Sequence, residues 1–154
     1  MPKTLENSNT RLLISEVLRK VSTAKTKKEK VELLTKHNSV ALRQLMIINF
    51  DESVVSLMPE GEVPYNPNDA PVGTDHTRLE SEYRGLYRFF RGGEPRLPRA
   101  KREQMFIQLL EGLSAEEAEL LCLVKDGRLN DKYKRITKAV ISEAFPTIVW
   151  GGRS

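Results

Sequence analysis

The chain has 154 residues, of which 39% are hydrophobic and 30% charged, with one cysteine and a formal net charge of +4. A chain of this size can bury roughly 70% of the surface that its unfolded form exposes, so residues 1–154 are expected to form one domain without a disulfide or metal staple. The longest apolar run, Leu120–Val124, is far shorter than the ~20 residues of a membrane-spanning helix, and the start lacks a signal-peptide pattern, which predicts an intracellular protein.

The first fifty residues predict three short helices. Apolar residues recur at helical spacing over Asn9–Ser22, which predicts an amphipathic helix there. A second helix follows the lysine-rich stretch 25–30, with Thr26 as its expected N-cap, because a threonine hydroxyl accepts a hydrogen bond from an N–H of the first turn. The third is expected from Ser39 to Phe50 and is apolar on most of its faces.

Residues 51–76 interrupt every helical period and predict a long loop. Six proline and glycine residues lie in this stretch, and asparagine and aspartate residues add turn chemistry. The wider segment 51–82 holds eight acidic residues against Arg78, a net charge of −7. Loops of this length are uncommon inside a compact domain and are often functional. The acidic loop is therefore one candidate for contact with a partner protein.

Four more helices are expected in the second half of the chain. They span Thr77–Phe90, Pro98–Gly112, Ser114–Gly127 and Asn130–Pro146. A C-terminal tail of residues 147–154 follows, of which Thr147–Trp150 is expected to pack back over the core. The expected helix starts are capping boxes of Thr77 with Glu80 and of Ser114 with Glu117, a first-turn Pro98, and a cap by Asn130. No internal repeat or strand-like alternation is visible, so the sequence predicts a single all-α domain of about seven helices.

Basic residues are concentrated in three segments. Residues 84–102 hold seven bases against one acid, residues 125–138 hold six against two, and residues 20–36 also hold six against two. Three arginines of the first segment recur at i, i+4 and i+7, so an α-helix that turns ~100° per residue would present them in one narrow arc. If two or three of these segments converge in space, they form a strip that contacts several phosphates and gains affinity from counterion release.

Contact with the phosphate backbone of nucleic acid is therefore the leading interpretation. The open alternative is that these side chains are only solvated charge on outer helix faces, or a protein-binding face. Aromatic residues between Tyr83 and Phe90 could stack on bases, although their spacing fits core packing better. The predicted nucleic-acid-binding residues are Lys27, Lys28, Arg84, Arg88, Arg91, Arg128, Lys132, Lys134, Arg135 and Lys138.

No set of residues in the sequence predicts catalysis, and we expect neither a cofactor nor a metal site. The two histidines, His37 and His76, and the single Cys122 lack the spacing of metal ligands, and Cys122 fits the role of a small buried hydrophobe. A hydrolase that uses Glu116, Glu117 and His76 is a minor alternative. The main rival is a protein-interaction module that uses the acidic loop.

Two stretches resemble a family of small uncharacterised proteins encoded by T4-like phages, notably those that infect cyanobacteria. The stretches are LMPEGEVPYNPNDAPVGTDHTRLE and FIQLLEGLSAEEAELLCLVKDGRL. The resemblance implies a viral protein that acts in the cytoplasm of a bacterial host or in the virion, and it implies no particular activity. Under it, the protein-interaction alternative becomes a phage structural component or a host-factor-binding protein.

A second resemblance is to the helical N-terminal DNA-binding domain of ATP-dependent DNA ligases, especially those of phages. The stretches LLISEVLRKVSTAKTKKEKVELLTKHNSVALRQLM and AELLCLVKDGRLNDKYKRITKAVISEAFP are similar to its first and closing helices. In that family the domain grips the minor groove of duplex DNA through backbone phosphates. By position, the resemblance points to Arg128, Lys132, Lys134, Arg135 and Lys138 near the closing turn and to Lys27 and Lys28 near the first.

Two departures from the ligase pattern limit what this second resemblance implies. Leu129–Asp131 stands where the family has glycine-containing sequence, and no adenylation or oligonucleotide-binding domain follows. Ligation is therefore not expected of this chain. The expected role is a non-enzymatic accessory of phage DNA metabolism that binds double-stranded DNA with little sequence specificity.

Overall fold

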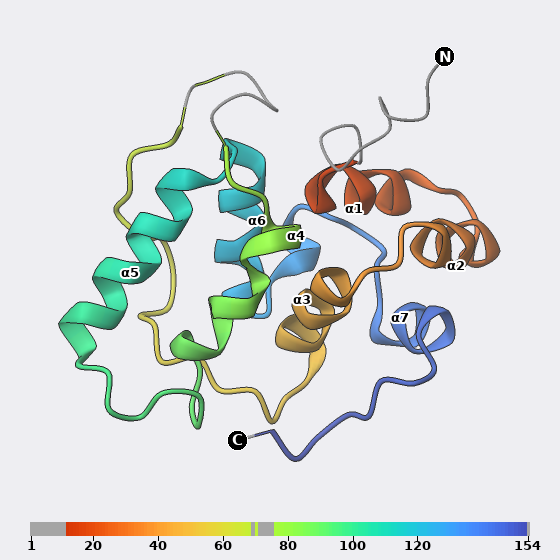
Figure 1. The fold of residues 1–154 in the computed structure, drawn as a ribbon. Helices are drawn as coiled ribbons and strands as arrows, with labels where there is room; N and C mark the ends of the chain where they lie inside the picture. The colour runs from red at the N-terminus through yellow and green to blue at the C-terminus, as the bar shows by residue number, and fades with distance from the viewer. Residues whose placement is uncertain (1–11, 69, 71–75, 154) are drawn as a thin grey trace.

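Helical segments dominate the described part of the chain, which comprises residues 12–68, 70 and 76–153 of a computed structural model (Figure 1). These residues form seven α-helices, two 3₁₀ helices and no β-strand. The elements in chain order are α1 (Ile14–Thr23), α2 (Lys27–Lys36), α3 (Val40–Phe50), α4 (Leu79–Glu82), η3 (Tyr83–Phe89), α5 (Arg99–Gly112), α6 (Ala115–Lys125), η4 (Leu129–Asp131) and α7 (Lys138–Ala144). The predicted all-α class is therefore confirmed.

One hydrophobic core joins the helices of the described residues. Helix α6 packs against α1, α3 and α5, and Leu18, Leu45 and Leu121 from three of these helices are completely buried. Figure 1 shows α1, α2 and α7 gathered at one end of the domain and α5 at the other. A single contiguous core is the mark of a single domain, as the sequence predicts.

The first three helices begin largely where their capping residues predict. The side chains of Thr26 and Ser39 each accept a hydrogen bond from the N–H three residues further on, at the starts of α2 and α3. Helix α1 begins later than predicted, at Ile14, because Leu13 has an extended backbone. The predicted part of this helix at residues 9–11 lies outside the described residues.

Helices α5 and α6 also follow the sequence, with one exception. The Ser114 hydroxyl caps α6 as predicted, but the carboxylate of Glu117 does not bind back to the start of its own helix. Its two oxygens instead accept hydrogen bonds from the N–H groups of Ile14, at 3.1 Å, and Leu79, at 3.0 Å. The completely buried Glu117 therefore caps α1 and α4, two helices that are distant from it in the sequence.

The predicted α-helix over Thr77–Phe90 is wrong in its form. Only the four residues of α4 are α-helical, and the following seven form the 3₁₀ helix η3. Thr77 is not a cap, because its N–H donates to the carbonyl oxygen of Gly112 at 2.8 Å and holds this segment extended. A 3₁₀ helix turns by about 120° per residue, so residues four apart point in different directions. The arginines at 84, 88 and 91 therefore do not form one arc.

The predicted long helix over Asn130–Pro146 is replaced by η4, a turn and the short α7. Asn130 does not cap a helix, because its side-chain amide donates to the carbonyl oxygens of Tyr133 and Ile136, both at 2.9 Å, and folds the turn between them. The true cap of α7 is Thr137, whose hydroxyl accepts from the N–H of the residue three further on at 3.2 Å.

The described residues of loop 51–76 form no helix and no strand, as predicted, while the parts of that prediction at residues 69 and 71–75 lie outside the described residues. The ammonium group of Lys125 holds the loop against α6 through the carbonyl oxygens of Pro59, at 2.8 Å, and Gly61, at 3.3 Å. The loop is thus attached to the core at its middle.

Ile148 and Trp150 pack against the core, as predicted for Thr147–Trp150. The indole N–H of Trp150 donates to a serine hydroxyl of α7 at 3.0 Å. Asp51, at the start of the long loop, accepts hydrogen bonds from the N–H of Gly151 at 2.9 Å and from the guanidinium of Arg153 at 2.6 Å. None of the described helices has both the length and the hydropathy that crossing a membrane requires.

Candidate nucleic-acid interface

The turn between η4 and α7 presents two of the predicted bases, Lys134 and Arg135, as exposed side chains. Arg135 has a φ angle of +64°, the one positive value for a residue other than glycine in the described chain. This left-handed conformation is unfavourable for a residue with a Cβ atom, and it often marks a functional turn. The hydrogen bonds of Asn130 hold the backbone around it.

This turn lies against the C-terminal end of α1. The hydroxyl of Ser22 donates to the carbonyl oxygen of Lys134 at 2.9 Å, and an open hollow of about 690 Å³ is lined by Ser22, Thr23, Lys134 and Arg135. Among the described residues, no hydrogen bond uses the N–H of Lys134, Arg135 or Ile136. Unused amide donors beside two cations are the groups that bind an oxyanion.

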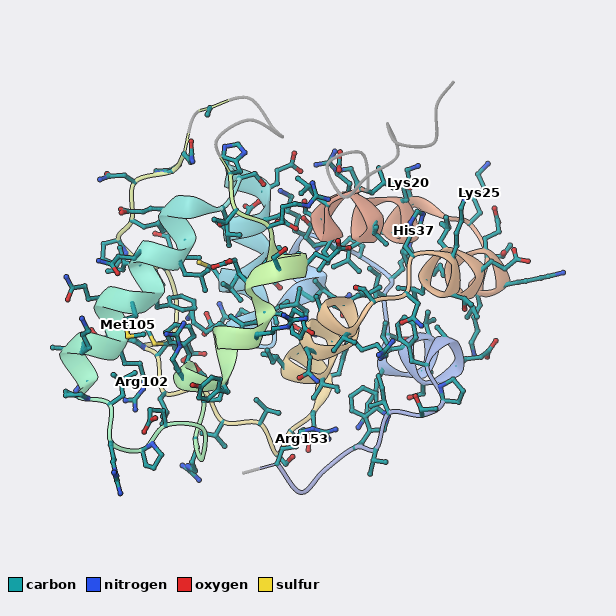
Figure 2. All side chains as sticks on the ribbon, viewed as in Figure 1. Lys20, Lys25, His37, Arg102, Met105 and Arg153 are labelled. Atoms are coloured by element: carbon teal, nitrogen blue, oxygen red, sulfur yellow. The ribbon has the colours of Figure 1, made fainter. Side chains whose placement is uncertain are left out.

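The lysine-rich start of α2 lies at the same end of the molecule. Helix α2 packs against α7, and Figure 2 shows Lys25 pointing outward at this end. Lys25 and Lys28 are exposed and form no ion pair within the described part of the chain. The ammonium of Lys138 lies 4.9 Å from the ring centroid of Trp150, a contact that leaves its charge in place. Two of the three basic segments therefore converge.

Three of the predicted bases face carboxylates instead of open solvent. Lys27 pairs with a glutamate of α7 at 3.1 Å, Arg128 pairs with Glu60 at 3.8 Å, and Lys132 pairs with Glu119. Exposed pairs of this kind contribute little to stability, but the carboxylate must be displaced or repelled before a phosphate can take its place. These three residues are therefore weaker candidates for DNA contact than the sequence indicates.

Arg84, Arg88 and Arg91 lie away from this surface. The Nε of Arg88 donates to a carbonyl oxygen of its own 3₁₀ helix at 2.9 Å, and its guanidinium lies 5.7 Å from the ring centroid of Phe89. Arg102, bonded to the Arg88 carbonyl oxygen at 2.9 Å, stands in Figure 2 at the opposite end of the molecule from Lys25. Two of the three basic segments therefore meet, whereas residues 84–102 lie at the other end of the core.

Three bases that contribute to the predicted charge of these segments, Lys30, Arg102 and Lys125, are buried and structural. The ammonium of Lys30 donates to the carbonyl oxygen of Ala24 at 2.5 Å. Arg102 is 8% exposed and donates to the backbone carbonyl oxygens of Arg88, in η3, and Glu94, in the turn that precedes α5. The Lys125 ammonium is fully buried beneath the long loop and pairs with Asp126 at 2.7 Å. A count of charges along the sequence treats such residues as surface charge. The structure shows instead that they are buried and hydrogen-bonded inside the fold. Ser22 and Thr23, which line the hollow, carry no sequence signal for this role.

The hydrolase alternative loses its main residue. Both oxygens of Glu117 are used as helix caps inside the core, and Glu116 pairs with Arg19. Burial also raises the pKa of Cys122 to about 11, so this thiol is not ionised at neutral pH. Within the described residues, no group of three or more histidine, cysteine, aspartate and glutamate side chains is arranged to hold a metal ion.

Comparison with known proteins identifies a family but no relative of established activity. The family of unknown function DUF6433 matches residues 17–131, about three quarters of the chain, from within α1 to the end of η4. The match includes the lysine-rich start of α2 and stops before Lys134 and Arg135. No curated protein and no solved structure matches the chain. The chain belongs to the family of unknown function DUF6433.

Proposed function

We propose that the protein binds duplex DNA through backbone phosphates, without catalysing a reaction, at the surface formed by the α1–α2 connection and the 132–138 turn. The observation that carries the proposal is the meeting of Lys134 and Arg135 with the end of α1, beside the exposed lysines at the start of α2. We name this surface, made of Lys25, Lys28, Lys134, Arg135 and Lys138, the basic end.

Physical chemistry supports a contact with phosphate here. The cations come from segments more than one hundred residues apart, and most of them have no carboxylate partner within the described part of the chain. For a surface that neutralises about four phosphates, the logarithm of the binding constant should fall with the logarithm of the salt concentration with a slope of roughly −3.6, since each phosphate contributes about −0.9. Backbone phosphates carry no base identity, so the binding is expected to be nearly independent of sequence.

The biological setting of the proposal comes from the resemblances. The likeness of the quoted stretches to proteins of T4-like phages supports a role in phage DNA metabolism in the host bacterial cytoplasm or in the virion. The likeness to a ligase DNA-binding domain supports duplex DNA as the ligand.

The test is the affinity for a short duplex, measured by fluorescence anisotropy across a salt titration. Replacing Lys134 and Arg135 together by glutamate is expected to weaken binding at low salt by about tenfold or more for every duplex sequence, because it removes two phosphate contacts and adds repulsion. The matched control is Arg96→Glu with Lys101→Glu, which makes the same charge change at exposed positions near the other end. No binding at low salt, or an equal loss in both variants, contradicts the proposal.

The protein-interaction alternative through the acidic loop has weaker support. Among the described residues of the loop, Asp51 is engaged with Arg153 and Glu60 with Arg128, and the middle of the loop is fastened to Lys125. These contacts use part of the charge that would attract a partner.

A further inference from the structure

A groove separate from the basic end lies between α3, η3 and the C-terminal tail. It has a volume of about 610 Å³ and is lined by fifteen residues, none of which is acidic. The chain as a whole has 21 acidic residues, eight of them in segment 51–82, whose residues 54 and 55 border the groove. The charged side chains that line the groove are Arg84, Arg91 and Arg153.

The floor of the groove is apolar and mostly aliphatic. Ile47 from α3, Leu86 from η3 and Phe90 after it are buried to more than nine tenths and present their remaining surface to the groove, and Val54 and Val55 from the loop extend it. Tyr87 lines the same groove with 53% of its surface exposed, one of three large hydrophobic side chains that the described chain exposes. An aromatic ring that is largely exposed beside an apolar floor favours contact with an apolar partner.

The rim carries arginines that are not neutralised. Arg84 and Arg91 are exposed and pair with no carboxylate in the described part of the chain; Arg84 contacts only the tyrosine beside it, with its guanidinium carbon 5.6 Å from the ring centroid. The third arginine, Arg153, already pairs with Asp51. Two guanidinium groups at the edge of an apolar groove match carboxylates that flank apolar side chains.

We infer that this groove docks a segment of a partner protein that carries acidic residues next to apolar ones. The floor favours a peptide over a single strand of nucleic acid, because bases bind on a series of exposed aromatic rings. Of the three aromatic residues that line the groove, Tyr83, Tyr87 and Phe90, only Tyr87 is largely exposed. The unpaired arginines select the acidic residues, and the floor receives the apolar ones. The inference is independent of DNA binding at the basic end.

The experiment is a selection of random dodecapeptides against the full-length protein, followed by anisotropy measurements on the enriched peptides. The expected peptides combine aspartate or glutamate with two or more apolar residues. Arg84→Glu with Arg91→Glu is expected to weaken their binding by about tenfold or more, since it places like charges against the peptide carboxylates. Tyr87→Ala is expected to weaken it by about fivefold or more, because an exposed aromatic contact is lost.

The matched control is Lys134→Glu with Arg135→Glu, which makes the same charge change at the basic end and is expected to leave peptide binding unchanged. Enriched peptides without acidic residues, or peptides indifferent to the groove substitutions, overturn the inference. Binding of oligothymidylate that is lost in the Arg84 and Arg91 variant also overturns it, because the groove would then be a single-strand site. The two double variants are expected to weaken the binding of different ligands, peptide in one case and duplex DNA in the other. Failure of the peptide-docking inference is therefore distinguishable from failure of the proposed DNA binding.

Discussion

The carboxylate of Glu117 is buried completely among the N-terminal ends of two helices, where it also interacts with the positive charge of Arg78. Burial raises the pKa of Glu117, and the N–H groups of Leu79 and Ile14 oppose that change by donating to the charged form. The start of α4 has no other capping side chain, whereas at the start of α1 Glu16 also accepts a hydrogen bond from the N–H of Leu13, at 2.7 Å. A single residue thus satisfies donors at the starts of two helices.

Glu117→Ala is expected to lower the free energy of unfolding by about 3 kcal/mol, because it leaves buried N–H donors without an acceptor. Glu117→Gln should lose less, since its amide oxygen can still accept one of the two hydrogen bonds. Urea unfolding followed by circular dichroism measures both. The neighbouring Glu116→Gln, which alters only a partly exposed ion pair, serves as the control and should change stability by less than about 0.5 kcal/mol. Equal stability of the Glu117 variants and the wild type would contradict this role.

At the scale of elements, the turn between η4 and α7 combines an unfavourable backbone with the chemistry of the basic end. Arg135 is held in the left-handed region by a turn that Asn130 and Ser22 fasten. Glycine would relax this backbone but would remove the guanidinium. Stability and DNA affinity are therefore expected to respond in opposite directions to the same substitution.

Arg135→Gly is expected to raise the free energy of unfolding by about 0.5 kcal/mol, because relief of the left-handed strain exceeds the added chain entropy of glycine. The same variant should bind duplex DNA about threefold to tenfold more weakly at low salt, through the loss of one phosphate contact. Chemical denaturation and fluorescence anisotropy give the two values. Arg135→Lys keeps both the backbone strain and the charge, and it should change neither value by much. A destabilised Arg135→Gly variant would show that the turn is not strained.

At the scale of the whole molecule, charge is divided between two ends. The basic end gathers residues from the α1–α2 connection, α2 and the 132–138 turn, whereas Arg84 and Arg91 border an apolar groove between α3, η3 and the C-terminal tail. One long-range contact closes the domain between them, since Asp51 binds the C-terminal tail one hundred residues away in the sequence. Burial alone would raise the pKa of Asp51, but hydrogen bonds from Ser53, Gly151 and Arg153 outweigh it and hold the pKa well below its ordinary value.

The pKa of Asp51 makes the attachment of the tail dependent on pH. A carboxylate whose pKa is depressed by folding contributes its full stability above the pKa of the unfolded chain, about 4, and loses that contribution as the pH falls further. Asp51→Asn should therefore be less stable than the wild type at neutral pH, and the difference should shrink below about pH 4. Urea unfolding across this pH range tests it, with the exposed Glu52→Gln as control. A constant difference at all pH values would contradict the expectation.

Local signals in the sequence determined much of the fold. Thr26, Ser39 and Ser114 cap the helices they are predicted to cap, because the hydroxyl and the N–H that it binds are three residues apart. The position of the long loop is also predicted by local signals, because proline and glycine residues restrict or release the backbone at their own positions. The all-α class follows from these signals and from helical periodicity.

Only the tertiary structure decided where the charges lie. Glu117 caps helices that are remote in the sequence, Lys125 is buried beneath the loop, and the 3₁₀ form of η3 removes the arginine arc. Each of these outcomes depends on contacts between distant segments. The periodicity of apolar residues within one segment carries no information about such contacts. The sequence by itself therefore determined which residues are basic and which segments are helical. Packing around α6 determined that two basic segments meet and that the third does not. Only packing could decide this, because the interaction between charges depends on their distance in space and not on their separation in the sequence.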